Sequence, residues 1–366
     1  MSYDTRKDLF KKIEDYRKQP LIAYVTSIRP NFSWQMTGDS IDYIIKQIQS
    51  IPKDQNQIDF LIISNGGDPI TALRIISLLR ERFTKISVLI PYVAYSAATI
   101  LALGADEIIM HPYSNLGPVD PQLTVSRQAD NGQPAQFQFS TEDIRNYIDF
   151  VKSDVGITDQ EYLSSAFNAL VKEVGPLPIG SSKRSQQLSL SSSIKMLETH
   201  MQDQNKAAEI AKALNSSFYH HGYAVSRSEA KKIGLNIIFP DLELETLMWD
   251  VWRDYSGEMK CTSDFNIINE IMTDPTAIKW LSSASIVNIP ANTPPQVAQN
   301  IIANIAQQSA SITQHPAIRI KELVATIESS RTATALYKTF HIIYWRDANM
   351  NLAFNATHYS EGWQNV

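Results

Sequence analysis

Two consecutive strand-turn-helix units lie within residues 57–123, and they constrain the fold more than any other feature of the chain. Residues 58–64 form a short apolar run that ends at turn residues, which predicts a buried strand rather than a buried helix. Residues 86–91 form a second run of the same kind. Each run is followed by a turn and a segment of helical character, so the pattern predicts parallel strands joined by right-handed helical crossovers, an α/β fold.

The first turn contains the glycine pair Gly66 and Gly67. Helical spacing begins at Thr71, and Asp68 is placed to cap that helix. Because glycine has no Cβ, two successive N–H groups can point into a cleft, which is the geometry that holds a developing oxyanion. An ordinary glycine turn explains the pair equally well when it is taken alone.

The second turn ends at Ser96, which precedes a small, apolar, helix-favouring run at residues 97–104. We expect Ser96 at a helix N-terminus, where the helix dipole and the N–H of Ala97 stabilise negative charge near the hydroxyl. A serine in this place is usually only a cap. The glycine pair one unit upstream favours a nucleophile instead, because the carboxyl ends of parallel strands meet at one edge of a sheet. The sequence therefore predicts Ser96 as the nucleophile and Gly66, Gly67 and Ala97 as oxyanion donors.

Several short motifs support this interpretation. They are Ser-Asn-Gly-Gly at 64–67, Tyr-Ser at 95–96, Gly-Ala-Asp-Glu-Ile at 104–108, Leu-Gly-Pro-Val-Asp-Pro-Gln at 116–122 and His-His-Gly-Tyr at 220–223. Together they resemble the Clp-protease/crotonase superfamily, and within it the serine dehydrogenase proteinase family, relatives of the signal peptide peptidase A (S49) serine peptidases. The resemblance covers residues 20–255 and implies a Clp-protease/crotonase-like spiral of βαβ units.

The resemblance also implies that the general base is a lysine, which would form a Ser-Lys dyad with Ser96. A lysine acts as a base only when burial or neighbouring positive charge lowers its pKa. Lys183 is the first candidate, because residues 179–183 predict a glycine-bearing loop similar to the lysine loop of signal peptide peptidase A. We expect a helical insertion over residues 141–174 to account for its distance from Ser96 along the chain. An exposed surface lysine would fit the position equally well.

Two other residues are alternative bases. Lys152 is predicted on the polar face of a helix, where most lysines are exposed to solvent. His111 follows the strand at residues 107–110 and could form a triad with Ser96 if Asp120 orients its ring. Clp-type enzymes place their histidine nearer to Asp120. His221, in the His-Gly-Tyr motif, is a possible supporting residue and more plausibly serves a structural turn.

Composition limits the class of protein. A chain of 366 residues predicts two domains, and its single cysteine, Cys261, excludes an intramolecular disulfide and suits a reducing compartment. Cysteines and histidines at zinc spacing are missing, and no acidic cluster suggests a catalytic metal, so we expect neither metal nor cofactor. A net charge of -5 without basic clusters argues against nucleic acid as a partner. The charged N-terminus lacks a signal peptide and no apolar run is long enough to span a bilayer, which predicts a cytoplasmic protein.

We expect three parts along the chain. Residues 1–19 form an N-terminal helical arm, residues 20–255 the peptidase domain, and residues 256–366 a smaller α+β module. Within these parts the sequence predicts a hairpin or flap at 123–139, an amphipathic helix at 296–309, and strands at 318–329, 332–345 and 350–358.

The expected function is a serine peptidase that cleaves protein or peptide substrates. The resemblance further implies a homo-oligomer. Two alternatives remain open. A crotonase-like acyl-CoA enzyme would use the same oxyanion donors without needing a serine. A catalytically inactive scaffold of the same fold is suggested by Ala97 and Ala98, because relatives commonly have glycines after the serine and a methyl group could crowd the scissile carbonyl.

Overall fold

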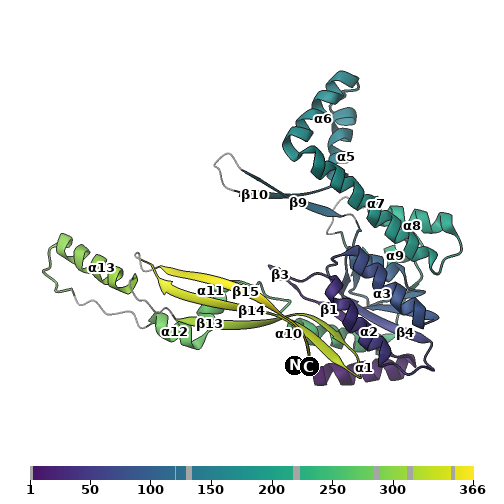
Figure 1. The fold of residues 1–366 in the computed structure, drawn as a ribbon, viewed down its shortest axis with the longest axis horizontal. Helices are drawn as coiled ribbons and strands as arrows, with labels where there is room; N and C mark the ends of the chain where they lie inside the picture. The colour runs from purple at the N-terminus through teal and green to yellow at the C-terminus, as the bar shows by residue number, and fades with distance from the viewer. Residues whose placement is uncertain are drawn as a thin grey trace. The chain divides into compact units, whose positions relative to one another are not determined.

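The structure is a computed structural model, and it describes residues 3–119, 121–128, 134–216, 223–282, 289–310, 316–347 and 351–366 (Figure 1). Two candidate residues, Asp120 and His221, lie outside the described residues. The chain forms two compact units. The first comprises Met1–Thr26, Trp34–Asp254 and Ile327–Ala333, and the second comprises Ser27–Ser33, Tyr255–Thr326 and Thr334–Val366. The expected helical arm therefore lies within the first unit, which also includes a short segment from the C-terminal part of the chain.

The first unit contains a parallel sheet, as the sequence predicts. Its strands are β1 (Leu21–Thr26), β4 (Gln57–Ile63), β5 (Lys85–Ile90), β7 (Glu107–Met110) and β12 (Ile237–Ile238). They are paired in the order β12-β7-β5-β4-β1, and every neighbouring pair is parallel. All of β1 and all but the first residue of β4 are buried, which explains why these strands are continuous apolar runs rather than alternating ones.

Helices follow these strands and supply the rest of the core. They include α1 (Tyr3–Arg17), the short helix η1 (Gly38–Ser40), α2 (Ile41–Gln49), α3 (Pro69–Arg82), α4 (Ala97–Leu103), α9 (Arg227–Ile233) and α10 (Leu242–Glu258). The predicted cap of α3 is confirmed, because the Asp68 carboxylate accepts hydrogen bonds from the N–H groups of Ile70 and Thr71. A smaller sheet joins β6 (Val93–Ala94), β8 (Asn115–Leu116) and β11 (Val225–Ser226) in the order β11-β8-β6.

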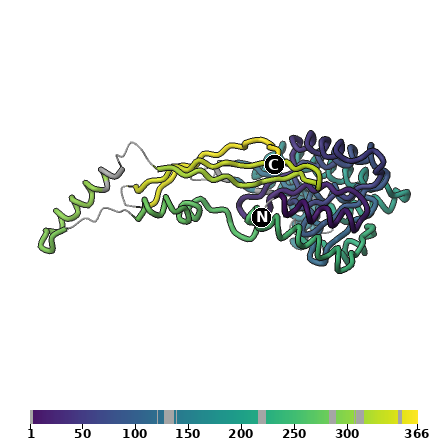
Figure 2. Tube along the Cα trace, turned by 90° about the horizontal axis from the view of Figure 1, so that it is seen from below, coloured from purple at the N-terminus to yellow at the C-terminus, as the bar shows by residue number. Residues whose placement is uncertain are grey.

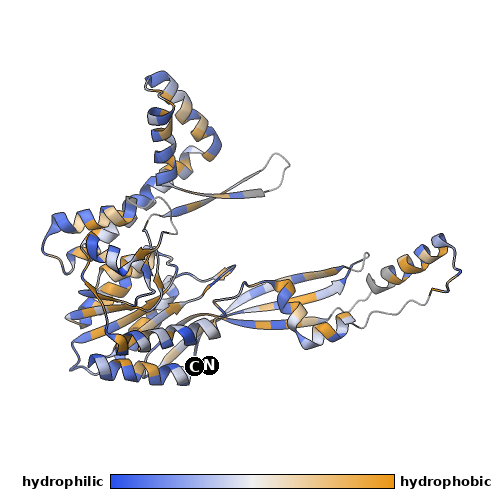
Figure 3. Cartoon of the chain, turned by 180° about the vertical axis from the view of Figure 1, so that it is seen from behind, coloured by the Kyte–Doolittle hydropathy of each residue, from blue (hydrophilic) through white to orange (hydrophobic). Residues whose placement is uncertain are grey.

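The predicted hairpin and helical insertion are both present in the first unit. β9 (Gln122–Gln128) pairs with β10 (Pro134–Ser140) in antiparallel fashion. The insertion consists of α5 (Thr141–Asp149), the π-helix η2 (Phe150–Asp154) and α6 (Gln160–Val174). None of the residues of α6 is buried, and hydrophilic and hydrophobic residues both occur along it (Figure 3).

The prediction of a loop around Lys183 is wrong. Residues 176–198 form the long helix α7 (Pro176–Glu198), which is followed by α8 (Gln204–Ser216). Pro176 takes the first helical position, where its missing N–H costs nothing, and Gly175 precedes it with φ +91°. Gly180 therefore lies inside a helix rather than at a turn.

The second unit is an α+β module, as predicted. Three long strands lie side by side in it, namely β13 (Ala317–Glu328), β14 (Ala333–Arg346) and β15 (Leu352–Asn365) (Figure 2). The other elements are β2 (Ile28–Arg29), β3 (Phe32–Ser33), α11 (Ile267–Thr273), α12 (Pro275–Ser282) and α13 (Pro295–Ala310). Arg29 is buried and forms ion pairs with Glu270 at 3.1 Å and Glu322 at 3.4 Å, which ties β2 to α11 and β13.

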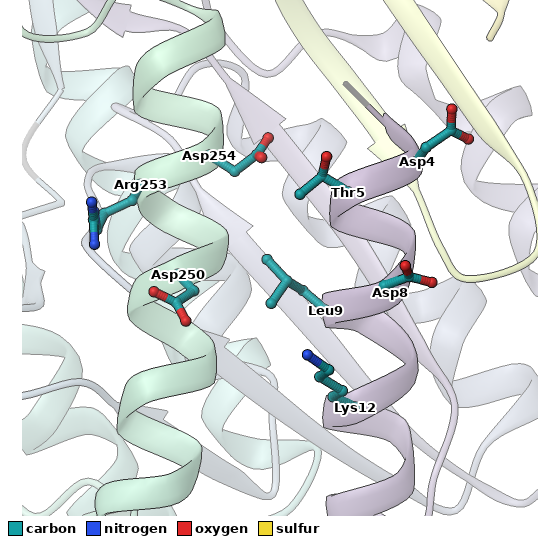
Figure 4. A pocket seen from close by; sticks show the side chains of 8 residues that line it. All are labelled: Asp4, Thr5, Asp8, Leu9, Lys12, Asp250, Arg253 and Asp254. Atoms are coloured by element: carbon teal, nitrogen blue, oxygen red, sulfur yellow. The ribbon is translucent and has the colours of Figure 1, made fainter. Parts of the chain in front are cut away.

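The N-terminal helix is fixed within the first unit by a buried ion-pair cluster. Arg6 of α1 donates to Asp254 of α10 at 2.7 Å and to Glu328 at 2.8 Å. All three side chains are at most 3% exposed. Beside this cluster, α1 and α10 lie side by side and enclose a hollow of about 620 Å³ that Asp4, Asp8 and Asp250 help to line (Figure 4).

Candidate active site

Ser96 lies in the turn between β6 and α4 with a backbone conformation that is rare for an L-residue. Its φ is +52° and its ψ is -119°. Although Ser96 occupies the N-cap position of α4, its side chain makes no capping hydrogen bond. Within the described part of the chain, no hydrogen bond joins the Ser96 hydroxyl to another residue. The ordinary capping role of a serine at a helix start therefore does not explain this residue.

The glycine turn and the serine turn are joined through their backbones. The N–H of Ser64 donates to the carbonyl of Val93 at 3.1 Å, and the N–H of Tyr95 donates to the carbonyl of Ser64 at 3.0 Å. A Cβ atom on Gly66 would lie 2.7 Å from the Cβ of Ser96. Only a glycine allows this approach, and a glycine is also favoured here by the φ of +103° at Gly66, which L-residues with a side chain rarely adopt.

The structure distinguishes the three oxyanion candidates. The N–H of Gly66 donates to the Ser64 hydroxyl at 3.0 Å, so this donor is already used. Gly67 is held by strand-like pairing with Met36. The N–H of Met36 donates to the carbonyl of Gly66 at 2.8 Å, and the N–H of Asp68 donates to the carbonyl of Met36 at 2.9 Å. Among the described residues, no hydrogen bond engages the N–H of Gly67 or of Ala97.

Ser96 and Gly67 line the same cleft, which has a volume of about 460 Å³. Its wall combines apolar and polar side chains: Gln35, Asn65, Asp68, Pro69, Ile100, Val119, Pro121, Gln122, Thr124, Ser185, Leu188 and Ser189. Among these described residues Asp68 has the only acidic or basic side chain, and its carboxylate is occupied in capping α3. The cleft thus offers a hydroxyl and backbone donors, and the described wall supplies no lysine or histidine.

One face of α7 closes the cleft. Ser185, Leu188 and Ser189 have the i, i+3, i+4 spacing of a single helix face. The Ser189 hydroxyl donates to the carbonyl of Val119, and the N–H of Val119 donates to the carbonyl of Leu214 in α8 at 3.1 Å. These bonds position the segment that precedes β9 against α7 and α8.

Lys183 lies on a different face of α7. It is exposed, its Nζ contacts the Gln186 side chain at 3.4 Å, and it lines a separate cavity with Arg145 and Lys212. With about 3.6 residues per turn, Lys183 lies about half a turn away from the centre of the face that lines the Ser96 cleft. The structure brings Ser96, Gly66, Gly67 and Ala97 together, and it does not bring Lys183 to them.

The two alternative bases also lie outside the cleft wall. Lys152 is an exposed residue of η2. His111 is buried, its Nδ1 accepts a hydrogen bond from the N–H of Tyr113 at 3.1 Å, and its ring stacks on Trp249 with centroids 4.9 Å apart. Burial lowers the pKa of His111 below its usual value, which favours the neutral imidazole.

Several residues of the cleft wall were not predicted from the sequence. Ile100 could have been found, because it follows Ser96 by four residues and so lies on the same side of α4. Gln122 falls within a motif that carried the resemblance. Ser185, Leu188 and Ser189 had no signal, since their segment was expected to be near a loop. Asp120 and His221 lie outside the described residues, although Val119 and Pro121 both line the cleft.

The described residues also bear on metal binding and on membrane insertion. In that part of the chain, no group of three or more histidine, cysteine, aspartate or glutamate side chains is arranged to hold a metal ion. No helix within it is both long and apolar enough to cross a membrane.

Comparison with known families agrees with the sequence motifs. Residues 3–135 match the family described as ClpP-like SDH-type serine proteinase. The resemblance to the serine dehydrogenase proteinase family is thereby confirmed over this segment, which contains both the glycine turn and Ser96, and the α/β fold class is confirmed with it.

Two curated relatives come from Methanocaldococcus jannaschii, and both are described as uncharacterized proteins. One is 26% identical over 202 residues, which is 55% of this chain and 60% of the relative. The other is 38% identical over 88 residues, which is 24% of this chain and 30% of the relative. The chain thus spans less than two thirds of the length of either relative.

Solved structures show weaker likeness. A serine-to-alanine mutant of the 1510-N membrane-bound stomatin-specific protease is 15% identical, with a TM-score of 0.37, over 62% of this chain and 82% of that protein. A lysine-to-alanine mutant of the same protease, in complex with a substrate peptide, is 15% identical, with a TM-score of 0.35, over 62% of this chain and 77% of that protein. ClpP1 from Listeria monocytogenes is 13% identical, with a TM-score of 0.33, over 64% of this chain and 99% of that protein.

Proposed function

We propose that this protein is a serine peptidase with Ser96 as its nucleophile. The observation that carries the proposal is the conformation of Ser96, whose strained turn presents a hydroxyl that caps no helix beside backbone donors in a cleft. A serine on a sharp strand-to-helix turn is the arrangement by which several hydrolase folds expose a nucleophile. The family match over residues 3–135 supports the same reaction class.

In the proposed reaction, the Ser96 hydroxyl oxygen attacks the carbonyl carbon of a peptide bond while a base takes its proton. The carbonyl oxygen becomes an oxyanion, which accepts hydrogen bonds from the N–H groups of Gly67 and Ala97. Collapse of this intermediate breaks the C–N bond, and the proton passes from the base to the leaving amine. Water then hydrolyses the acyl-serine ester by the same steps.

Gly67 is the better oxyanion donor of the glycine pair, because the N–H of Gly66 is used by Ser64. Gly66 supports the site in another way. Its missing Cβ lets the two turns approach, since an added Cβ would lie 3.0 Å from the Ala97 nitrogen. Ala97 has its N–H at the first turn of α4, where the helix dipole favours negative charge.

Lys183 remains our first candidate for the base, with Lys152 and His111 as alternatives. Its place on α7 sets a condition for that role. The helix must rotate about its axis so that the face with Lys183, instead of the face with Ser185 and Ser189, lines the Ser96 cleft. The Gln186 amide, which contacts Lys183 at 3.4 Å, must also be released. The described conformation is therefore a state in which the proposed dyad is not assembled.

The substrate that fits this proposal is an extended segment of a protein or peptide. The β9–β10 hairpin starts at the cleft, with Gln122 and Thr124 in its wall. A peptide can pair with such a strand through its main chain, which is how an unfolded segment is held without dependence on its sequence. We also propose a homo-oligomer in the cytoplasm, a proposal that rests on the resemblance.

The test is to incubate the purified protein with a fluorophosphonate probe and, separately, with unfolded casein. We expect an adduct on Ser96, located by mass spectrometry, and casein cleavage that Ser96→Ala abolishes. Lys183→Ala should label at least 100-fold more slowly, because removing a general base costs about 10² to 10⁴ in rate. Arg184→Ala is the matched control, since it changes the adjacent charge on α7 without removing a candidate base.

Each alternative has its own outcome in this experiment. Activity that survives Lys183→Ala and is lost in Lys152→Ala or His111→Ala would transfer the base to that residue. A wild-type protein that neither labels nor cleaves would contradict the peptidase proposal and favour the inactive scaffold or the acyl-CoA enzyme, which a coenzyme A binding measurement separates.

A further inference from the structure

Ser64 follows β4 directly and makes three side-chain hydrogen bonds next to the glycine turn. Its hydroxyl oxygen accepts from the Thr26 hydroxyl at 2.7 Å and from the N–H of Gly66 at 3.0 Å. Its own proton is donated to the carbonyl of Gly66 at 3.4 Å. Thr26 and Ser64 are each 1% exposed. The two buried hydroxyls thus connect the end of β1 to both polar groups of Gly66.

The carbonyl of Gly66 is held from two sides. It accepts a hydrogen bond from the N–H of Met36 at 2.8 Å in addition to the bond from Ser64. A trans peptide unit is planar, and its C=O and N–H point in opposite directions. Because this carbonyl is directed at Met36 and Ser64, the N–H of Gly67 in the same peptide unit points away from both. Gly67 lines the Ser96 cleft.

The glycine turn needs such external bonds to keep one orientation. Gly66 has a φ of +103° and Gly67 a φ of +146°. Glycine enters these regions readily, but it also leaves them readily, because it has no Cβ to restrict its backbone. The direction of the Gly67 N–H is therefore set by the groups that hold the Gly66 carbonyl.

We propose that Ser64 and Thr26 are positioning residues for Gly67 as the oxyanion donor, an inference that rests on the proposed peptidase function. The hydrogen bonds run in one direction, from the Thr26 hydroxyl to Ser64 and from Ser64 to the carbonyl of Gly66. Bonds in such a chain polarise one another, which makes the N–H of Gly67 a stronger donor as well as an oriented one. In this role neither buried side chain contacts the substrate.

The first test compares the kinetics of casein cleavage by full-length variants. Loss of a whole oxyanion donor costs about 10² to 10³ in kcat, so Ser64→Ala, which weakens a donor, should lower kcat by about tenfold or more. KM should stay the same, because the oxyanion forms only in the transition state. Thr26→Val keeps the side-chain shape without the hydroxyl and should lower kcat by about threefold. Thr26→Ser, which keeps the hydroxyl, should recover most of that loss.

Ser87→Ala is the matched control for these variants. Ser87 is a buried serine of β5, the strand next to β4, and its hydroxyl donates to Glu107 at 2.8 Å rather than to the glycine turn. Urea unfolding of every variant measures the general cost of losing a buried hydroxyl. We expect Ser87→Ala to lose stability and to keep the wild-type kcat.

The second test observes the Gly67 amide and does not depend on activity. Gly67 is the only glycine of the chain that follows another glycine, so its NMR signal is selected by labelling glycine with ¹³C at the carbonyl and ¹⁵N at the amide. We expect the amide proton of Gly67 to move upfield in Ser64→Ala and, by less, in Thr26→Val, because a less polarised N–H is more shielded. Ser87→Ala should leave the signal in place.

Two results would overturn the positioning role. One is a Gly67 signal that stays unchanged in both Ser64→Ala and Thr26→Val, whether or not the protein cleaves casein. The other is a loss of kcat in Ser87→Ala as large as that in Ser64→Ala. A wild-type protein that cleaves no casein, while the Gly67 signal moves as expected, would contradict the peptidase proposal and support the hydrogen-bond chain, so the two failures are told apart.

Discussion

Ser96 stores backbone strain in the first unit. Its φ of +52° places an L-residue in a region that costs about 1 to 2 kcal/mol, and no capping bond of its side chain repays that cost. The surrounding structure maintains the conformation, because Tyr95 is bonded to Ser64 and Thr99 donates to the carbonyl of Ala94 at 2.7 Å. Strain at a residue whose hydroxyl faces a cleft is typical of a functional position.

This strain can be measured with two substitutions that both remove the hydroxyl. We expect Ser96→Gly to be more stable to urea than Ser96→Ala by about 1 kcal/mol, because glycine adopts a positive φ at little cost and alanine does not. Neither variant should react with the fluorophosphonate probe. Equal unfolding free energies for the two variants would mean that the turn relaxes and that Ser96 is not strained in solution.

The residues of the candidate site differ in how well the sequence predicted them. Gly67 and Ser96 were proposed from local signals, a glycine pair after a strand and a serine before a small-residue helix, and both line one cleft in the structure. Lys183 was chosen from a Gly-x-x-Lys shape, which is also local, but the side of α7 on which it lies depends on packing of that helix against Val119. That packing has no signature within a few residues of the lysine.

At the scale of the element, α7 is the clearest difference between expectation and structure. Gly180 suggested a loop, since glycine disfavours a helix interior by about 1 kcal/mol. In the helix, no described atom lies within 4 Å of the position where its Cβ would be, so the glycine serves no close contact. Packing of other parts of α7, where Ser182, Ser189, Ser193 and Leu197 are buried, outweighs this local preference.

The C-terminal end of α7 is joined to α4 by a histidine whose titration gives a pH prediction. His200 follows α7, and its Nε2 lies 2.9 Å from the carbonyl oxygen of Leu103, the last residue of α4. Burial lowers the pKa of His200 below its usual value, although the bond to Leu103 acts in the opposite direction. The folded protein therefore binds a proton at this site less readily than the unfolded chain does.

We expect His200 to make the protein less stable in mild acid. The contribution of the neutral His200 to the free energy of unfolding is fully present above its pKa in the unfolded chain, about 6.5. It is lost as the pH falls through the lower pKa of His200 in the folded protein. His200→Gln keeps an amide nitrogen in reach of the Leu103 carbonyl and does not titrate. Urea unfolding between pH 5 and 8 should show wild type losing stability relative to this variant below pH 6.5. A difference that stays constant with pH would contradict the lowered pKa.

At the scale of the whole molecule, segments far apart in the sequence meet in the first unit. Arg6 pairs with Glu328, 322 residues away, and with Asp254. Glu14 also accepts hydrogen bonds from Ser330 and Arg331. Buried charges that are paired stabilise little by themselves, but a buried charge that loses its partner is strongly unfavourable.

Arg6→Met should therefore destabilise the first unit by about 3 to 5 kcal/mol, because it leaves two buried carboxylates without their cation. Methionine retains most of the apolar volume of the arginine stem. Lys11→Met on the same helix is the matched control, since Lys11 is 55% exposed and should change the unfolding free energy by less than about 0.5 kcal/mol. A loss for Arg6→Met as small as that of the control would show that the cluster is hydrated in solution.

The sequence predicted the parts of the molecule better than their grouping. The parallel strands, the hairpin and the three C-terminal strands each have a local pattern of apolar residues and turns. No such local pattern indicates that residues 327–333 belong to the first unit, because β13 is one continuous strand and its sequence does not change character at the unit boundary. Long-range pairing such as that of Arg6 with Glu328 is visible only in three dimensions.

The inclusion of residues 327–333 in the Ser96-bearing unit affects the order of events during synthesis. Domains generally fold as units as they leave the ribosome, at about 5 to 20 residues per second. Here the partner of Arg6 is residue 328, so the first unit cannot be completed while the nascent chain is still shorter than that. A nascent chain that stops before residue 328 contains Ser96 without the pairing of Arg6 and Glu328 that secures α1, so the proposed catalytic turn is synthesised long before the unit around it can be completed.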